Sequence, residues 1–252
     1  MPFRICVSEN AEGGISMGKK GTAIVLAAGQ GRRMGTATQK QFLDVNGKPL
    51  LYYSLRGFQE SPLIQEIILV TGEDKISFCR DRIVEPYGFT KVSQIIPGGE
   101  QRYDSVYEGL KHCANCDYVF IHDGARPFVT EEILNRAWEE VQQYQACAVG
   151  VPAKDTIKIT DGEGFGMETP ARSSVWQVQT PQVFSYSLIR KAYDLLQHTD
   201  RSQVTDDSMV VEHMLVQKVH MTMGDYRNIK VTTPEDLPLA EVFLKKIKKF
   251  EK

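Results

Sequence analysis

The sequence predicts an α/β fold built on a mostly parallel, doubly wound sheet of the Rossmann-like kind. From Thr22 to Val151, short apolar runs alternate with segments of helical periodicity, which is the pattern of β-α-β units. Turns rich in glycine and charge follow three of the apolar runs, as is typical of the carboxyl ends of parallel strands. After Pro152 the residues alternate between polar and apolar, which predicts a β-hairpin arm.

Length and charge restrict the class of protein. The chain has 252 residues, enough for one large core, and residues 21–252 are expected to form a single domain with the arm at about 153–180. The net charge of −2 argues against nucleic acid as a partner, since such binders carry a basic excess. No stretch approaches the ~20 apolar residues that span a bilayer, so we expect no membrane partner and a cytoplasmic location. Residues 1–20 are expected to be a disordered leader.

The five cysteines are scattered and odd in number, as expected of reduced thiols. Cys113 and Cys116 follow His112 and raise the alternative of a metal site. Without a second cysteine pair at zinc spacing, a surface turn is the favoured interpretation.

The first strand is expected at Thr22–Leu26, and a turn of small residues follows it at Ala27–Gly31. Arg32, Arg33 and Lys40 come shortly after this turn. Backbone N–H groups of a glycine turn bind anions, and three nearby cations suit a triphosphate. The alternative is an ordinary strand-to-helix turn with solvated arginines.

Two common phosphate-binding loops are excluded at this turn. The P-loop string Gly-x4-Gly-Lys-Ser/Thr does not occur in the chain. The dinucleotide fingerprint requires a third glycine where the chain has Met34, so that match is partial.

The following elements alternate between helix and strand. The helices are expected at Lys48–Gln59, Lys75–Tyr87, Gln101–Cys113 and Glu131–Tyr144, and the strands at Ile64–Thr71, Val92–Ile96, Tyr118–Ile121 and Cys147–Val151. The segments Gly29–Lys40, Gly98–Arg102 and Asp123–Arg126 each follow a strand. Because ligands bind at the carboxyl ends of parallel strands, these three segments are expected to converge on one crevice.

The remaining elements follow Pro152. Thr156–Thr160 and Ser173–Gln179 are expected to form the hairpin arm, which is too thin to be stable alone and should pack on its own domain or on a second subunit. The last elements are expected to be a helix at Thr205–Leu215 with Thr205 as N-cap, strands at Lys218–Met223 and Asn228–Thr232, and a helix at Pro234–Lys249.

A series of short motifs occurs in a specific order along nearly the whole chain. They are Ala27-Ala28-Gly29-x-Gly31-x-Arg33-Met34, Lys40-Gln41-Phe42, Gly98-Gly99, Arg102, Ser105, His122-Asp123-x-Ala125-Arg126-Pro127, Asp155-Thr156, Arg172, Thr180-Pro181-Gln182, Thr205-Asp206-Asp207 and Asn228-Ile229-Lys230-Val231-Thr232. Together they resemble the 2-C-methyl-D-erythritol 4-phosphate cytidylyltransferase family of the non-mevalonate isoprenoid pathway, with its nucleotidyltransferase fold. Gln39 departs from the residues that often precede Lys-Gln in that family.

The resemblance implies that the chain is an enzyme that transfers the cytidylyl group of CTP to 2-C-methyl-D-erythritol 4-phosphate, a polyol phosphate, giving 4-diphosphocytidyl-2-C-methyl-D-erythritol and pyrophosphate. It implies that Arg33 and Lys40 stabilise the transition state at the α-phosphate, and that Arg172 and Lys230 position the incoming phosphate. Asp123 is implied to bind Mg²⁺ or another divalent cation.

The resemblance also implies a binding role for a larger set of residues. Those around CTP are Ala27, Ala28, Gly29, Gly31, Gly99, Arg102, Ser105, Asp123 and Gly124. Those around the acceptor are Arg126, Thr156, Arg172, Thr180 and Lys230. The family pattern places the arm across the two-fold axis of a homodimer, in the partner's site.

Structural alternatives remain open for single residues. Asp123 can be a turn residue paired with Arg126. Asp206 and Asp207 favour capping a helix over binding metal, and His122 favours a hydrogen-bonded scaffold role over acid–base chemistry.

Rival functions also remain open. The nearest is ribitol-5-phosphate cytidylyltransferase, whose glycine turn tends to read Ala-Gly-Gly. A hexose-1-phosphate nucleotidyltransferase, a dinucleotide-dependent oxidoreductase and a non-catalytic nucleotide sensor fit fewer of the motifs.

Overall fold

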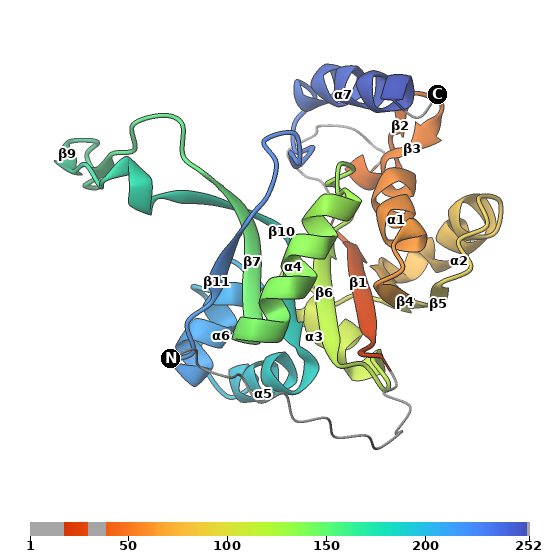
Figure 1. Ribbon diagram of the computed structural model, residues 1–252, viewed down its shortest axis with the longest axis horizontal. Helices are drawn as coiled ribbons and strands as arrows, with labels where there is room; N and C mark the ends of the chain where they lie inside the picture. Colours follow the sequence, from red (N-terminus) through yellow and green to blue (C-terminus); the bar gives the residue numbers. More distant parts are fainter. Residues whose placement is uncertain (1–17, 30–38, 251–252) are drawn as a thin grey trace, which may run out of the picture.

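The computed structural model describes residues 18–29 and 39–250, which form a central seven-strand sheet in the order β11-β7-β10-β6-β1-β4-β5 (Figure 1). The strands are β1 (Gly21–Ala27), β4 (Ile64–Thr71), β5 (Val92–Pro97), β6 (Tyr118–Asp123), β7 (Ala146–Pro152), β10 (Trp176–Ser185) and β11 (His220–Met223). β10 runs antiparallel to both of its neighbours, and every other adjacent pair in this sheet is parallel. The predicted α/β class with a mostly parallel sheet is therefore confirmed.

Helices cover both faces of the sheet, as the doubly wound prediction requires (Figure 1). One layer contains α1 (Leu50–Glu60), α2 (Ile76–Cys79) and α4 (Glu131–Tyr144), and the other contains α3 (Arg102–His112), α5 (Tyr186–Leu196) and α6 (Asp207–Leu215). Side chains alternate across a strand, so Ala23 and Val25 of β1 pack in the first core and Ile24 packs in the second. This double burial explains why β1 is apolar throughout its middle.

A third, smaller core lies under α7 (Asp236–Phe250), which packs near β2 (Asp44–Val45) and β3 (Lys48–Pro49). These two short strands form a hairpin whose turn residues Asn46 and Gly47 have φ angles of 54° and 80°. The predicted helix at Lys48–Gln59 therefore begins later, at Leu50.

Two predicted elements are wrong in detail. The helix expected at Lys75–Tyr87 is broken into η3 (Glu73–Lys75), α2 and the π-helical η4 (Arg80–Val84). Asn228–Thr232 is not a strand, because its backbone bonds to turns: the N–H of Val231 donates to the carbonyl of Ala125 at 2.9 Å. That bond holds the segment against the turn that follows β6.

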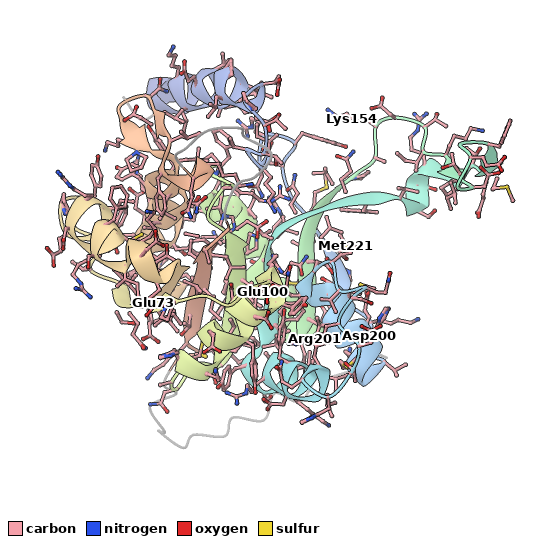
Figure 2. All side chains as sticks on the ribbon, turned by 180° about the vertical axis from the view of Figure 1, so that it is seen from behind. Glu73, Glu100, Lys154, Asp200, Arg201 and Met221 are labelled. Carbon is pink, nitrogen blue, oxygen red and sulfur yellow. The ribbon has the colours of Figure 1, made fainter. Side chains whose placement is uncertain are left out.

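Between β7 and β10 the chain leaves the sheet as a projecting segment, residues 153–175, called the arm here (Figure 1). Lys154 lies at its start (Figure 2). Within it, β8 (Ile159–Thr160) pairs with β9 (Gly166–Glu168). The prediction that Ser173–Gln179 completes the hairpin is wrong, because this segment leads into β10 of the central sheet, where Val183 and Phe184 are fully buried.

No helix among residues 18–29 and 39–250 is long and apolar enough to cross a membrane. The predicted leader spans residues 1–20, of which 1–17 lie outside the described part of the chain.

Candidate active site

A cavity of about 600 Å³ lies where the three predicted segments meet at the carboxyl ends of the strands. Its walls come from the end of β1, from the turn before α3, from the end of β6 and from the segment after β11. The lining residues are Leu26, Ala27, Ala28, Gly29, Lys40, Gln41, Gly99, Glu100, Gln101, Arg102, Ser105, Asp123, Ala125 and Lys230. The expected convergence of distant segments on one crevice is confirmed for these residues.

Gln41 fixes the start of the first glycine turn. Its side-chain amide is buried and donates from Nε2 to the carbonyls of Ala27 at 2.6 Å and Gly29 at 3.1 Å. Lys40, the preceding residue, therefore lies beside the same turn on the cavity wall. Gly31 and Arg33, two further predicted site residues, lie outside the described residues.

The second glycine turn approaches the first closely. A Cβ atom on Gly98 would stand 2.6 Å from Ser105 Oγ and 2.7 Å from the Cβ of Ala28, so a side chain there would push the two turns apart. The N–H of Gly99 donates to Ser105 Oγ at 3.2 Å. Ser105 thus holds the turn that forms one cavity wall.

Gly124 follows β6 and also marks a close backbone approach. Its N–H donates to the carbonyl of Leu26 at 2.8 Å, and a Cβ there would lie 2.9 Å from the same oxygen. This contact keeps the end of β6 against β1, although Gly124 itself does not line the cavity.

Asp123, the last residue of β6, lies among three cations. Its Oδ2 is 2.7 Å from Lys230 Nζ and 4.0 Å from Arg126 Nε, and its Oδ1 is 3.2 Å from Arg102 Nε. Burial acts to raise the pKa of Asp123, but the three cations outweigh it and the pKa lies well below its usual value. The cavity therefore contains an ionised carboxylate that is only 11% exposed.

Arg102 bridges Asp123 to a second carboxylate that sequence reasoning assigned only to the end of a helix. Its Nη1 and Nη2 donate to the two oxygens of Asp207 at 2.9 and 2.8 Å. Burial alone would lower the pKa of Arg102, but the two carboxylates raise it well above its ordinary value. Asp206, not Thr205, is the N-cap of α6, because its side chain accepts from the N–H of Met209.

His122 is fully buried and serves the scaffold. Its Nε2 is 3.0 Å from the carbonyl of Arg126, and its Nδ1 is 3.1 Å from Thr180 Oγ1, which accepts from the N–H of Asp123. Because a carbonyl accepts only, Nε2 carries the proton and Nδ1 accepts from Thr180. Burial lowers the pKa of His122 to about 4, so the ring is neutral near pH 7. The hydroxyl of Thr180, which is predicted to contact the acceptor substrate, takes part in this network.

Arg126 lies at the edge of the same network. Its Nη1 donates to the carbonyl of Asn228 at 2.9 Å and its Nη2 to that of Val178 at 3.4 Å. Its buried Nε has no hydrogen-bond partner among the described residues. Because Asn228 lies two residues before Lys230, this bond to its carbonyl also fixes the segment that places Lys230 beside Asp123.

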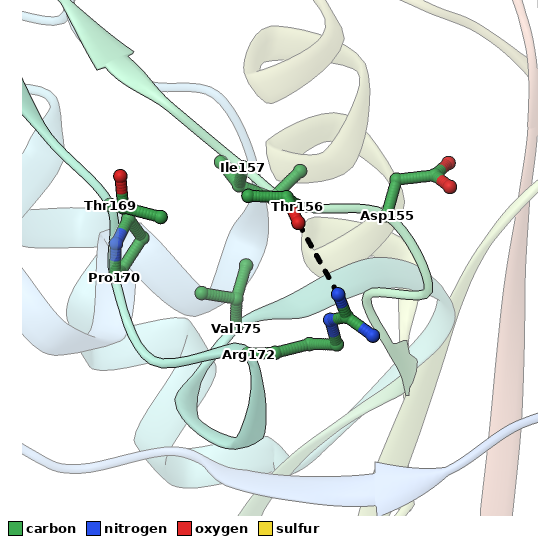
Figure 3. A pocket seen from close by; sticks show the side chains of 7 residues that line it. All are labelled: Asp155, Thr156, Ile157, Thr169, Pro170, Arg172 and Val175. Atoms are coloured by element: carbon green, nitrogen blue, oxygen red, sulfur yellow. Dashed lines mark hydrogen bonds between the residues drawn. The ribbon is translucent and has the colours of Figure 1, made fainter. Parts of the chain in front are cut away.

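The arm carries a separate small cavity of about 210 Å³ (Figure 3). Nη2 of Arg172 donates to Thr156 Oγ1 at 3.3 Å across it. None of its lining residues, Asp155, Thr156, Ile157, Thr169, Pro170, Arg172 and Val175, lines the main cavity. Within one copy of the chain, the structure therefore does not bring these two predicted site residues to the others.

The carboxylates that line the main cavity are those of Asp123 and Glu100. No group of three or more His, Cys, Asp or Glu side chains in the described ranges is arranged to hold an ion, Cys113 and Cys116 included. Mg²⁺ in nucleotide sites commonly takes one or two carboxylates, with the phosphates of the substrate as its other ligands. An ionised Asp123 fits that pattern.

Comparison with known proteins gives a consistent result. Residues 22–246 match the family model of 2-C-methyl-D-erythritol 4-phosphate cytidylyltransferase. The chain is 49% identical over 229 residues to the protein of that name from Clostridium perfringens, covering 91% of this chain and 100% of the relative. It is 46% identical over 232 residues to the one from Lachnoclostridium phytofermentans, covering 92% and 99%.

The fold is similar to solved structures with related names. The crystal structure of 4-diphosphocytidyl-2C-methyl-D-erythritol synthase from Anaerococcus prevotii superimposes with a TM-score of 0.80 at 34% identity, covering 90% of this chain and 96% of that one. The Francisella tularensis 2-C-methyl-D-erythritol 4-phosphate cytidylyltransferase gives 0.72 at 29% identity, covering 89% and 99%.

Proposed function

The chain belongs to the 2-C-methyl-D-erythritol 4-phosphate cytidylyltransferase family, and we propose that its main cavity is where this enzyme transfers the cytidylyl group of CTP to 2-C-methyl-D-erythritol 4-phosphate. An oxygen of the acceptor phosphate forms a bond to the α-phosphorus, and the bond to the β-phosphate breaks. The products are 4-diphosphocytidyl-2-C-methyl-D-erythritol and pyrophosphate. The observation that carries the proposal is the cation cluster around Asp123 at the meeting point of two glycine turns.

The chemistry requires charge stabilisation and no general base. The acceptor is a phosphate monoester and is already anionic near pH 7, so it attacks without losing a proton to the protein. What must be overcome is the repulsion between two anions and the charge that develops on the leaving pyrophosphate. The neutral, hydrogen-bonded His122 agrees with this requirement, because both of its ring nitrogens are used in the scaffold.

CTP is proposed to bind between the two glycine turns. The backbone at Ala27–Gly31, with Gly99 and Ser105, would enclose the nucleotide, while Arg102 supplies positive charge. Arg33 and Lys40 are proposed to stabilise the transition state at the α-phosphate. Gly124 contributes by keeping the end of β6 close to β1.

Asp123 is proposed to hold Mg²⁺ or another divalent cation. When bound with the triphosphate, the ion would neutralise charge on its oxygens. Lys230 and Arg126 stand beside Asp123 and are proposed to hold the phosphate of the acceptor. Thr180 is proposed to support this site by fixing the backbone of Asp123.

A homodimer is proposed to complete the site. Thr156 and Arg172 are joined to each other on the arm and do not line the main cavity of their own chain. The arm exposes Phe165 at 69% and Met167 at 71%, which supports its packing on a second copy. In that arrangement Arg172 of one copy would position the acceptor phosphate bound by the other. The cytoplasmic location expected from the sequence stays a prediction.

Pyrophosphate release tests the function directly. The enzyme is given CTP and Mg²⁺ with either 2-C-methyl-D-erythritol 4-phosphate or ribitol 5-phosphate. Release with the branched acceptor alone is expected. Release with ribitol 5-phosphate alone would keep the fold and the cytidylyl chemistry but overturn the acceptor. No release with either, while CTP still binds, would favour a nucleotide sensor.

A further inference from the structure

A buried carboxylate stands behind the cavity wall, outside the set of residues that the sequence singled out for chemistry. Asp207 is the first residue of α6 and its side chain has no exposed surface. It accepts two hydrogen bonds from Arg102, at 2.9 and 2.8 Å, in a bidentate pair. It does not line the cavity, so it would reach a bound nucleotide only through Arg102.

We propose that Asp207 is a positioning residue, which with Tyr193 fixes the guanidinium of Arg102 in the orientation that binds CTP. This inference rests on the proposed function, since it assigns the main cavity to CTP. It places a residue of α6 behind a cavity whose lining residues come from the first half of the chain and from Lys230.

The charges at the two helix ends explain why Arg102 requires this support. Arg102 is the first residue of α3, and a cation at the positive end of a helix dipole is unfavourable. Asp207 is the first residue of α6, where the same effect stabilises an anion. Pairing the two side chains removes the conflict at α3 and holds the guanidinium on the cavity wall.

The geometry leaves Arg102 partly available. A guanidinium has five N–H groups, and the described residues use three of them, two on Asp207 and one on Asp123. Arg102 remains 28% exposed on its side chain and lines the cavity. The two other N–H groups are left for a phosphate or another acceptor on CTP, in a plane that the two carboxylates determine.

Asp207 is itself held in place. The hydroxyl of Tyr193 donates to its Oδ1 at 2.6 Å, and Tyr193 is fully buried in the core between α3 and α5. A second ion pair, from Arg201 to Asp104 at 2.8 Å, ties the segment before α6 to the first turn of α3. Arg201 precedes α6 and Glu100 precedes α3, and Figure 2 labels both residues. The orientation of Arg102 is thus coupled to the position of α6 relative to α3.

The test measures the Kd of CTP with Mg²⁺ by calorimetry, in the full-length protein. Asp207→Asn keeps the shape and removes the charge, and the Kd is expected to rise about tenfold, with kcat changed less than about threefold. Asp194→Asn is the matched control, because Asp194 also pairs with an arginine and a tyrosine hydroxyl but lies away from the cavity. The control is expected to leave the Kd unchanged.

A double-mutant cycle separates positioning from general stability. In an Arg102→Lys background the bidentate pair is already lost, so adding Asp207→Asn is expected to raise the Kd less than about twofold. An unchanged Kd in the single variant, the same tenfold rise in both backgrounds, or an equal rise in the control would each overturn the proposal.

Two further measurements bear on the proposal. Should Asp207→Asn not fold, Tyr193→Phe is used, with an expected rise of about threefold that disappears with Arg102→Lys. An unchanged Kd in Tyr193→Phe would then overturn the proposal. If the wild-type protein binds CTP but releases no pyrophosphate, the proposed function fails, while the binding cycle still decides the role of Asp207.

Discussion

Replacing Asp123 with asparagine removes one charge from the centre of the cation cluster and nearly preserves the volume of the side chain. Breaking a buried ion pair by removing one partner costs about 3–5 kcal/mol of folding free energy. Here Lys230 is 34% exposed and Arg102 keeps Asp207, so part of that cost is relieved by solvent and by the second carboxylate. We expect a loss of about 2–3 kcal/mol at pH 7, or about 4–12 °C in Tm.

The direction of the pKa shift at Asp123 determines how this loss of stability depends on pH. The folded-state pKa of Asp123 lies below its unfolded value of about 3.9, so its stabilisation is complete above about pH 5 and declines as the pH falls. The difference in unfolding free energy between wild type and Asp123→Asn is expected to be constant from pH 6 to 8 and to shrink by about 1.3 kcal/mol at pH 3.

Urea unfolding across that pH range measures both quantities. Asp225→Asn is the control, because Asp225 pairs with an Arg227 side chain that is 60% exposed, and such pairs contribute about 0–1 kcal/mol. A difference for Asp123→Asn that is as large at pH 3 as at pH 7 would show that the loss comes from packing. No difference at pH 7 would refute the assignment of Asp123 as a stabilised, ionised carboxylate.

Three other predictions concern catalysis. Lys40→Ala is expected to lower kcat about 100-fold or more with an unchanged circular dichroism spectrum, and near-normal turnover would contradict its role at the α-phosphate. Arg172→Ala is expected to lose turnover while its Kd for CTP stays within about twofold. Mixing this variant with Lys40→Ala and allowing the subunits to exchange should restore about a quarter of wild-type activity, because half of the dimers are then mixed and each mixed dimer contains one intact site. No recovery of activity would count against the shared site. Since burial lowers the pKa of His122 to about 4, kcat at saturating substrates is expected to stay flat from pH 7 to 9. If kcat instead shows an inflection in this range, and the inflection disappears in the His122→Asn variant, His122 would be a catalytic base.

The sequence predicts best the elements whose signals are local. α4 occurs at Glu131–Tyr144, as its helical periodicity predicts, and β1 begins one residue before the predicted strand. The Asn46–Gly47 turn is also a local signal of a hairpin, and it was missed because β2 and β3 are too short to show alternation. α5 at Tyr186–Leu196 was not predicted, although its apolar residues recur at helical spacing.

Long-range contacts account for what the sequence does not predict. Asp207 pairs with Arg102 across 105 positions of the chain, so nothing near either residue identifies the partner. Trp176–Ser185 alternates like an arm strand at its start, yet it joins the central sheet, where it lies antiparallel between β6 and β7. Asn228–Thr232 has strand-like residues, but its backbone bonds to the turn after β6.

The most direct test of the central claim is ³¹P NMR of one reaction containing the enzyme, CTP, Mg²⁺ and 2-C-methyl-D-erythritol 4-phosphate. Transfer of the cytidylyl group predicts that the CTP and monoester signals decline together, while the signals of pyrophosphate and of a new unsymmetrical diphosphate grow in equal amounts. Loss of CTP to CMP and pyrophosphate, with the monoester signal unchanged, would contradict the account, because the acceptor phosphate would then not be the attacking group.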